Sequence, residues 1–263
     1  MDLAKYGPWA LIIGGSEGIG EACARMLAAD GFKLVLVARR QAPLEKLAGE
    51  LRRQGAEVLV ISADLSQADA LERVRTATDD LEIGLLIYNA GPMGKIGNFV
   101  EVPKEVTNGV IAINALGLVD FARHYGASMC QRGRGGLIVA GSVGSYVGAP
   151  RMADYAASKA FSRIFTEALW GEWAPLGVDV LYLGIGLTGT PALARLGGDI
   201  NVAEKPEKVA QEAFDNIANG PLWIVSTKGN VERARQHATV DGRAEIVRAF
   251  ADAQRRQIEK KAR

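Results

Sequence analysis

The chain has 263 residues, which suits one large α/β domain better than two independent ones. Hydrophobic residues make up 48% of it and charged residues 23%, so an extensive core and an ordinary soluble surface are both expected. A net charge of +1 excludes a general electrostatic attraction to nucleic acid or to anionic membranes.

The few cysteines and histidines give no sign of a metal site. Cys23 and Cys130 fall in segments expected to be helical, without metal-ligand spacing, and a chain of this size needs no disulfide framework. His124 and His237 are far apart and are interpreted as exposed or packed side chains. The N-terminus has no signal-peptide core, and no stretch reaches the roughly 18 apolar residues of a membrane span. We expect a cytoplasmic enzyme or binding protein.

A strand, a glycine-rich turn and a helix open the chain. Residues 10–13 are a short apolar run, typical of a parallel strand buried on both faces. The turn that follows contains Gly14, Gly18 and Gly20, and its backbone N–H groups could approach a pyrophosphate at the positive end of the helix. A tight turn without a ligand is the alternative interpretation.

The second strand is expected at residues 34–37, and two arginines follow it. Folds that bind NAD usually place an acid here for the ribose 2′-hydroxyl, whereas an arginine can accommodate a 2′-phosphate. This chain has Ala38, Arg39 and Arg40, and Ser16 in the glycine turn is a candidate extra phosphate donor. NADP(H) is therefore favoured over NAD, and a solvated pair of charges is the alternative.

Strands and helices alternate through the rest of the chain. Amphipathic helices are expected at 43–54, 67–78, 104–131, 154–174 and 206–218, and further strands at 58–61, 85–89, 136–140, 178–185 and 222–225. This order predicts a single-domain, doubly wound parallel sheet of about seven strands with helices on both faces. An apolar lid is expected at about 188–204 and a C-terminal extension at about 227–263. The extension ends in basic residues, interpreted as a solvated terminus: Lys260, Lys261 and Arg263.

Several polar residues follow strands or interrupt apolar faces. Asp64 and Leu65 come after the third strand, where they could touch an adenine edge. The fourth strand ends in Asn89, Ala90 and Gly91, at the edge of the sheet where ligands bind. Asn114 stands among apolar helix positions, so it must be hydrogen-bonded, either as a structural tie or within a polar relay.

Tyr155 and Lys159 are four residues apart, so on a helix they share a face. A phenol has a pKa of ~10, and a close ammonium is expected to lower this pKa toward neutrality. The pair would then serve as an acid–base group for a carbonyl or alcohol oxygen. Alone, it also fits an amphipathic tyrosine and a solvated lysine on a surface helix. Ser142, just upstream at the end of the fifth strand, favours the first interpretation.

These residues together resemble the short-chain dehydrogenase/reductase family over about residues 9–226. The glycines of the turn match its cofactor glycines, and residues 88–91 resemble its Asn-Asn-Ala-Gly turn, with Tyr88 in place of the first Asn. Residues 185–191 are similar to the family's stretch over the nicotinamide, with Ile185 in place of proline. The positions of the family's catalytic tetrad are occupied by Asn114, Ser142, Tyr155 and Lys159.

The resemblance implies a Rossmann fold, NADP(H) as cofactor and no metal. Within the family, residues 6–9, Glu17 and residues 177–180 look like bacterial NADPH-dependent hydroxysteroid dehydrogenases of the 7β type. The implied cofactor contacts are Gly14, Ser16, Glu17, Gly18, Ile19, Gly20, Arg39, Arg40, Asp64, Leu65, Asn89, Ala90, Gly91, Tyr155, Lys159, Gly186, Thr188 and Thr190.

An apolar substrate cleft is the remaining expectation. Its predicted lining is Met93, Ser142, Tyr146, Val147, Leu193 and Leu196, with Ile200 also on the lid. A steroid or similarly bulky ketone fits this lining, and a β-ketoacyl thioester or a small xenobiotic carbonyl fits nearly as well. A non-catalytic NADP(H) sensor and an NAD-dependent alcohol oxidation are further alternatives. The family commonly pairs the helices at 104–131 and 154–174, which implies a homodimer or homotetramer.

Overall fold

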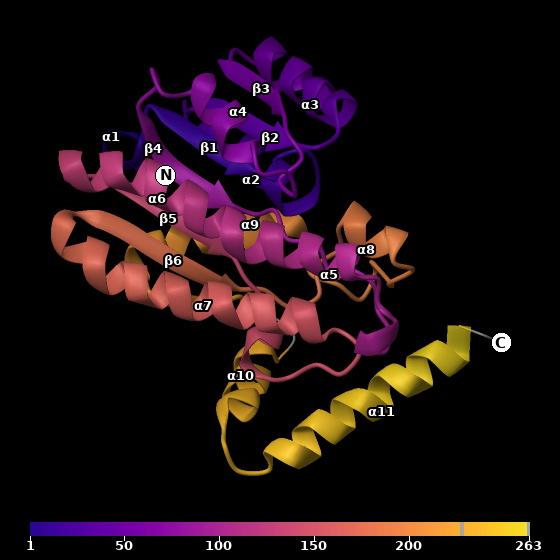
Figure 1. The fold of residues 1–263 in the computed structure, drawn as a ribbon. Helices are drawn as coiled ribbons and strands as arrows, with labels where there is room; N and C mark the ends of the chain where they lie inside the picture. The colour runs from indigo at the N-terminus through magenta and orange to yellow at the C-terminus, as the bar shows by residue number, and fades with distance from the viewer. Residues whose placement is uncertain (227–228, 262–263) are drawn as a thin grey trace.

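The protein folds around one seven-stranded parallel sheet, and the computed structural model describes residues 1–226 and 229–261 (Figure 1). The strand order is β3-β2-β1-β4-β5-β6-β7, which confirms the predicted doubly wound sheet. The side chains of the basic C-terminal end (Lys260, Lys261 and Arg263) lie outside the described residues. The strands are β1 Trp9–Ile13, β2 Lys33–Ala38, β3 Val58–Ser62, β4 Ile83–Tyr88, β5 Gly135–Ala140, β6 Val178–Gly184 and β7 Leu222–Ile224.

Helices cover both faces of the sheet, because successive residues of each buried strand point to opposite sides. Ile12 and Leu36 pack with α2 (Gly18–Ala29), α3 (Gln41–Arg53) and α9 (Pro206–Asn216). On the other face Ile13 and Val37 pack with α4 (Ala70–Thr76), α6 (Leu118–Arg132) and α7 (Ala153–Trp173). All four of these strand residues are fully buried.

The chain order reverses between β1 and β4, the two central strands. From β1 the chain proceeds through β2 to β3 at one edge, and β4 then pairs with the opposite side of β1. The loops that leave these two strands diverge, and such a point is where ligands bind in open α/β sheets. The lid helix α8 (Pro191–Arg195) stands beyond this end of the sheet (Figure 1).

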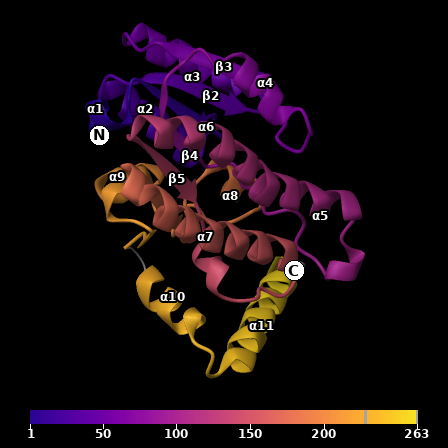
Figure 2. The ribbon, with the colours of Figure 1, turned by 60° about the vertical axis from the view of Figure 1, so that its left-hand side comes forward.

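Several elements differ from the prediction. A short helix α1 (Leu3–Tyr6) precedes β1, and α4 is shorter than expected because residues 67–69 form turns. The expected helix 104–131 consists of α5 (Lys104–Ile111), a π-helical turn η2 (Ala112–Gly117) and α6. The C-terminal extension is two helices, α10 (Asn230–Ala238) and α11 (Arg243–Lys261), which lie outside the three layers (Figure 2).

Short 3-10 turns complete the chain: η1 Phe99–Glu101, η3 Val143–Tyr146, η4 Ala174–Leu176 and η5 Ile217–Asn219. One helical run within the described residues, Lys104–Arg132, is long and apolar enough to cross a membrane by length and composition. Core helices pass the same test, and this run supplies Phe121 and Tyr125 to the core beside the sheet. It is therefore weak evidence for a membrane span.

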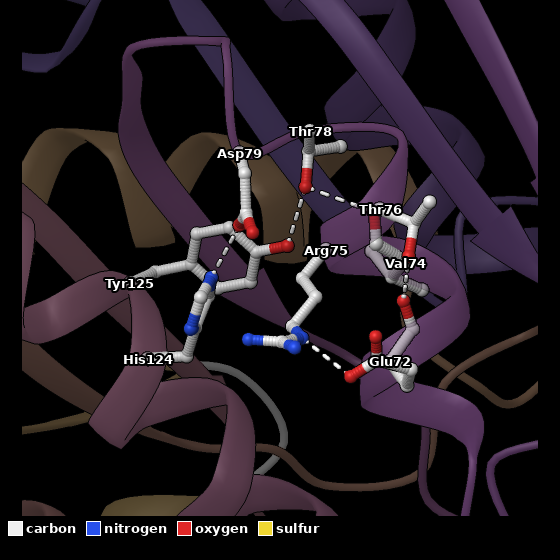
Figure 3. A network of polar contacts seen from close by, with 8 residues as sticks. All are labelled: Glu72, Val74, Arg75, Thr76, Thr78, Asp79, His124 and Tyr125. Carbon is white, nitrogen blue, oxygen red and sulfur yellow. Dashed lines mark hydrogen bonds and ion pairs between the residues drawn. The ribbon is translucent and has the colours of Figure 1, made fainter.

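His124 has a structural role. Its Nε2 lies 2.8 Å from Oδ1 of Asp79, and its ring meets that of Tyr125 edge-on with centroids 4.7 Å apart. The Tyr125 hydroxyl in turn lies 2.7 Å from Oγ1 of Thr78 (Figure 3). These contacts tie the loop after α4 to α6, at a distance from the carboxyl ends of the strands. Within residues 1–226 and 229–261 no group of three or more His, Cys, Asp or Glu side chains could hold a metal ion.

Gly84 in β4 provides a test of the packing between the sheet and the N-terminal segment. A Cβ on Gly84 would lie 2.4 Å from the carbonyl oxygens of both Tyr6 and Gly7, and backbone cannot move aside easily. We therefore expect Gly84→Ala to lower the free energy of unfolding, measured in urea, by about 1–3 kcal/mol.

Gly109→Ala is the matched control, because a Cβ on Gly109 in α5 would meet nothing within 4 Å. This substitution is expected to raise the free energy of unfolding by up to ~1 kcal/mol, the difference in helix propensity. Equal effects of the two substitutions would contradict the close approach at Gly84.

Candidate functional site

Two adjoining hollows open where the loops that follow β1 and β4 diverge. The larger, which we call the reactive cleft, has a volume of about 410 Å³ and lies between the ends of β4, β5 and β6 and the lid. The smaller, the arginine hollow, has a volume of about 260 Å³ and lies beside the ends of β2 and β3. Both are lined by Gly14, Ser16, Glu17, Ala90, Gly91 and Pro92. One elongated ligand could therefore occupy both.

Three of the four predicted catalytic residues line the reactive cleft: Ser142, Tyr155 and Lys159. Ser142 follows β5 and caps η3, where its Oγ accepts a hydrogen bond from the Gly144 N–H at 3.0 Å. Tyr155 and Lys159 lie one turn apart on α7, and the Lys159 Nζ is 5.9 Å from the centroid of the Tyr155 ring. The sheet and α7 thus bring together residues from two separate elements.

Lys159 is held in a buried position. It is 6% exposed, and its Nζ donates a hydrogen bond to the carbonyl oxygen of Ala140 at 2.9 Å. A Cβ on Gly91 would lie 2.6 Å from this Nζ and 3.6 Å from Oδ1 of Asn114. The glycine therefore leaves room for both polar groups at the same side of the turn after β4.

Asn114, the fourth predicted catalytic residue, lies just behind the cleft. Its Nδ2 donates to Oγ of Ser158 at 2.9 Å and to the carbonyl of Pro92 at 3.2 Å. Its Oδ1 is buried and has no hydrogen-bond partner within the described part of the chain. Buried amide oxygens are rarely left unpaired, so this atom is available to a water or a ligand group.

Tyr88 supports the π-helical turn that carries Asn114. Its hydroxyl donates to the carbonyl of Ile113 at 2.6 Å. Turns of this kind are frequent at functional sites, because the extra residue in the turn changes the direction of a side chain. The sequence marked Tyr88 only as a departure from the family's turn, and no local pattern indicated this contact.

Tyr182 is a second supporting residue that the sequence did not indicate. It lies on β6 as a fully buried side chain, and its hydroxyl accepts from the Ser142 N–H at 2.9 Å and donates to the Lys159 carbonyl at 3.3 Å. It therefore fixes the backbone of two catalytic positions at once. In the sequence it is one more apolar strand residue.

Burial controls the protonation of the reactive groups. It raises the pKa of Tyr155, and a hydrogen bond with Ser142 opposes this shift. The expected net lowering of the Tyr155 pKa toward neutrality is therefore wrong, because burial outweighs the contacts that favour the phenolate. Burial also lowers the pKa of Lys159 to about 8, because the charged form loses its hydration.

Most of the predicted cofactor residues line the two hollows. The reactive cleft contains Ile19, Asn89, Gly186, Thr188 and Thr190 together with the shared residues. The arginine hollow contains Arg39, Arg40, Asp64 and Leu65. Gly18 and Gly20 line neither, because they form the first turn of α2 beneath the glycine turn.

The arginine hollow combines three guanidinium groups with two carboxylates. Glu17 Oε2 lies 2.5 Å from Nη2 of Arg40 and 3.1 Å from Nη1 of Arg195. Arg195 comes from the lid, and the sequence did not mark it. The Asp64 pKa is lowered, mainly by the Ser66 backbone N–H and also by the charge of Arg39. This collection of cations can hold a phosphate group.

Only part of the predicted substrate lining faces the reactive cleft. Met93, Leu193 and Leu196 do, whereas Ile200 is 50% exposed on the lid and lines no part of the cleft.

The prediction that Tyr146 and Val147 line the substrate cleft is corrected by the structure. They line a separate cavity of about 370 Å³ against α11, because η3 turns them away from Ser142. The guanidinium of Arg163 lies 4.5 Å from the Tyr146 ring centroid.

The two ends of the lid are tied to each other by backbone hydrogen bonds. The Gly189 N–H donates to the Glu204 carbonyl at 2.8 Å, and the Glu204 N–H donates to the Leu187 carbonyl at 2.9 Å. Thr190 caps α8 by accepting from the Leu193 N–H. The segment between these ties exposes large apolar side chains, namely Leu196, Ile200 and Val202. Such a segment can cover a ligand without unfolding its own base.

Comparison with known proteins identifies the family to which this fold and this cleft belong. A family model of the short-chain dehydrogenases matches residues 8–236. The chain therefore belongs to the short-chain dehydrogenase family, whose members use nicotinamide cofactors, and is an oxidoreductase of this type. The sequence-based resemblance to this family is confirmed.

Two relatives with named activities are similar to this chain over most of its length. A 7β-hydroxysteroid dehydrogenase of Collinsella aerofaciens is 35% identical over 234 residues, covering 86% of this chain and 88% of the relative. A very-long-chain 3-oxoacyl-CoA reductase of Podospora anserina is 33% identical over 218 residues, covering 81% of this chain and 64% of the relative.

Among the solved structures that resemble this chain, two are similar over most of its length. One, from work on the stereoselectivity of 7β-hydroxysteroid dehydrogenase, has a TM-score of 0.88 at 32% identity and covers 95% of this chain and 98% of its own. The other, a short-chain dehydrogenase from Sphingobium yanoikuyae in complex with NADPH, has a TM-score of 0.78 at 30% identity and covers 89% of this chain and 96% of its own.

The buried lysine generates a stability prediction. The unfolded chain binds a proton at Lys159 with a pKa of ~10.4, and the folded protein binds it with a pKa of about 8. Protonation therefore opposes folding, and this contribution to stability rises with pH between about 8 and 10. We expect Lys159→Met to raise the free energy of unfolding at pH 7 by on the order of 2 kcal/mol, with a smaller gain at pH 10.

Urea denaturation of both proteins at the two pH values measures this effect. Lys46→Met is the control, since Lys46 is exposed on α3 and its substitution should change neither value appreciably. A destabilised Lys159→Met protein at pH 7 would contradict the cost assigned to the buried ammonium.

Proposed function

We propose that this protein is an NADP(H)-dependent oxidoreductase that interconverts a ketone and a secondary alcohol on a bulky hydrophobic substrate, a steroid. The observation that carries the proposal is the convergence of Ser142, Tyr155 and Lys159 on one cleft with an apolar lid. The likeness to 7β-hydroxysteroid dehydrogenases supports the steroid as substrate class. Arg39 and Arg40 in the adjoining hollow support the choice of NADP(H).

In the proposed mechanism a bound nicotinamide cofactor supplies the hydride for reduction. Tyr155 donates its hydroxyl proton to the carbonyl oxygen, while Ser142 Oγ hydrogen-bonds that oxygen and holds it in place. The raised Tyr155 pKa keeps the phenol protonated at neutral pH, as a proton donor requires. Lys159, mostly charged at pH 7, stabilises the phenolate left behind.

Asn114 completes the proton path in this proposal. Its buried Oδ1 would accept a hydrogen bond from an ordered water that connects the Lys159 Nζ with solvent. Lys159 would also hold the ribose hydroxyls of the cofactor. Met93, Leu193 and Leu196 would contact the apolar body of the substrate and exclude water from the cleft.

Reduction of a β-ketoacyl thioester is the second candidate. The likeness to 3-oxoacyl-CoA reductases favours it, and the same three catalytic groups would serve.

We further propose a homodimer or homotetramer in the cytoplasm. The apolar side chains exposed on the helices that would pair support this assembly: Ile111, Leu116, Phe161, Ile164 and Trp170.

A substrate panel tests the function. NADPH oxidation is measured with 3-, 7- and 17-ketosteroids, a β-ketoacyl thioester and a small aromatic ketone. We expect turnover with at least one ketosteroid, and Tyr155→Phe should lower kcat by about 10²–10⁴-fold with nearly unchanged NADPH affinity. Turnover of the thioester alone would replace the steroid by the second candidate. Tight NADPH binding without any turnover would indicate a cofactor sensor.

Arg39 tests the cofactor preference. Arg39→Ala is expected to weaken NADPH binding by about tenfold or more, because a charge-assisted contact to a phosphate is lost. NADH binding, which involves no such phosphate, should change little. Fluorescence titration measures both affinities, and equal losses would count against a phosphate contact at this position.

A further inference from the structure

A lid residue reaches across the opening of the site to the glycine turn. Arg195, at the end of α8, donates to both carboxylate oxygens of Glu17: Nη1 to Oε2 at 3.1 Å and Nη2 to Oε1. Glu17 immediately precedes α2 and also pairs with Arg40, with Nη2 of the arginine 2.5 Å from Oε2. One carboxylate therefore connects the lid with the arginines that follow β2.

The position of this cluster relates it to the cofactor. Arg195 lines the arginine hollow together with Arg39 and Arg40, although it comes from a segment far away in the sequence. The lid itself lines the reactive cleft through Leu193 and Leu196. Through Arg195 the lid, which lines the reactive cleft, also contacts the site proposed for the adenosine half of the cofactor.

The charges show that Glu17 acts as an anion between cations. The hydrogen bond from Arg195 is the largest cause that lowers the Glu17 pKa, followed in effect by the charges of Arg195 and Arg40. All three side chains keep access to solvent, with 24% of Glu17, 49% of Arg40 and 55% of Arg195 exposed. An ion pair with this much exposure contributes little stability, so another anion can replace the carboxylate at small cost.

We propose that Glu17 occupies the place that the 2′-phosphate of NADP(H) takes when the cofactor binds, and that Arg195 is a specificity-determining residue for this phosphate. A phosphomonoester carries about two negative charges and three acceptor oxygens, so it binds two or three guanidinium groups better than one carboxylate does. When the phosphate binds, Arg40 and Arg195 exchange Glu17 for it. The lid is then tied directly to the nucleotide. This inference rests on the proposed use of NADP(H).

The exchange has two consequences for discrimination between cofactors. NAD(H) lacks the 2′-phosphate, so it offers Arg195 no replacement for Glu17 and leaves the lid tied to the protein alone. Glu17 also opposes the phosphate by competing for the same guanidinium groups. The lid residue and the competing carboxylate therefore set the preference together with Arg39 and Arg40.

Nucleotide fragments without a nicotinamide test the inference apart from catalysis. Isothermal titration measures the affinities of adenosine 2′,5′-bisphosphate and of adenosine 5′-monophosphate for the full chain and its variants. We expect Arg195→Gln to weaken the bisphosphate about tenfold and the monophosphate little. Glu17→Gln should strengthen the bisphosphate several-fold, because the competing charge is removed.

Arg25→Gln is the matched control for the loss of one positive charge. Arg25 lies on α2 and pairs with Glu21 at 2.7 Å and Glu50 at 2.6 Å, outside both hollows. Its substitution should leave the ratio of the two affinities unchanged. An equal change of this ratio in Arg25→Gln and Arg195→Gln would reduce the effect to net charge and overturn the inference.

Hydrogen exchange of residues 188–204 gives a second readout. In the wild type the bisphosphate should slow exchange in this segment more than the monophosphate does, and in Arg195→Gln this difference should disappear. If Arg195 only stabilised the lid, Arg195→Gln would accelerate exchange in the absence of nucleotide and leave the ratio of the two affinities unaltered. This result would refute the inference. Equal binding of the two fragments by the wild type would instead remove the proposed NADP(H) preference.

Discussion

The burial of one ammonium group organises the reactive end of this protein. Lys159 is almost inaccessible to solvent, and its hydrogen bond to the Ala140 carbonyl replaces only part of the lost hydration. The lowered Lys159 pKa expresses the remaining cost. The surrounding backbone accepts this group because Gly91 has no side chain there and Tyr182 fixes the strand end and helix turn beside it. A charge kept in such a position is available to a phenolate or to ligand hydroxyls.

The other end of the site follows a different principle. Arg40 and Arg195 are partly exposed and both pair with Glu17, so part of the positive charge of this hollow is already compensated by a carboxylate of the protein. The reactive end provides stiffness through buried contacts, whereas the arginine hollow provides exchangeable ion pairs. This division suits the proposed function, in which a carbonyl is positioned closely and a charged nucleotide is released after each turnover.

Much of the fold could be predicted because each strand of a sheet covered on both faces is a short apolar run between turns. The boundaries shifted by one to three residues, and the break in the long helix was missed. The π-helical turn accepts a hydrogen bond from the hydroxyl of Tyr88, which lies far from it in the sequence. The prediction that Tyr146 and Val147 line the cleft was wrong for a related reason. The direction of the loop after Ser142 is set by packing between distant segments.

The sequence by itself determined the alternation of elements, the glycine turn, the arginines after the second strand and the residue types that carry the chemistry. These features are local, since periodicity and spacing of a few residues define them. Only the tertiary structure decided which way the Tyr155 pKa shifts, that Tyr182 supports Ser142, and that Arg195 meets Glu17. Burial and contacts between distant segments exist only once the chain has folded, so no pattern within a short window can contain them.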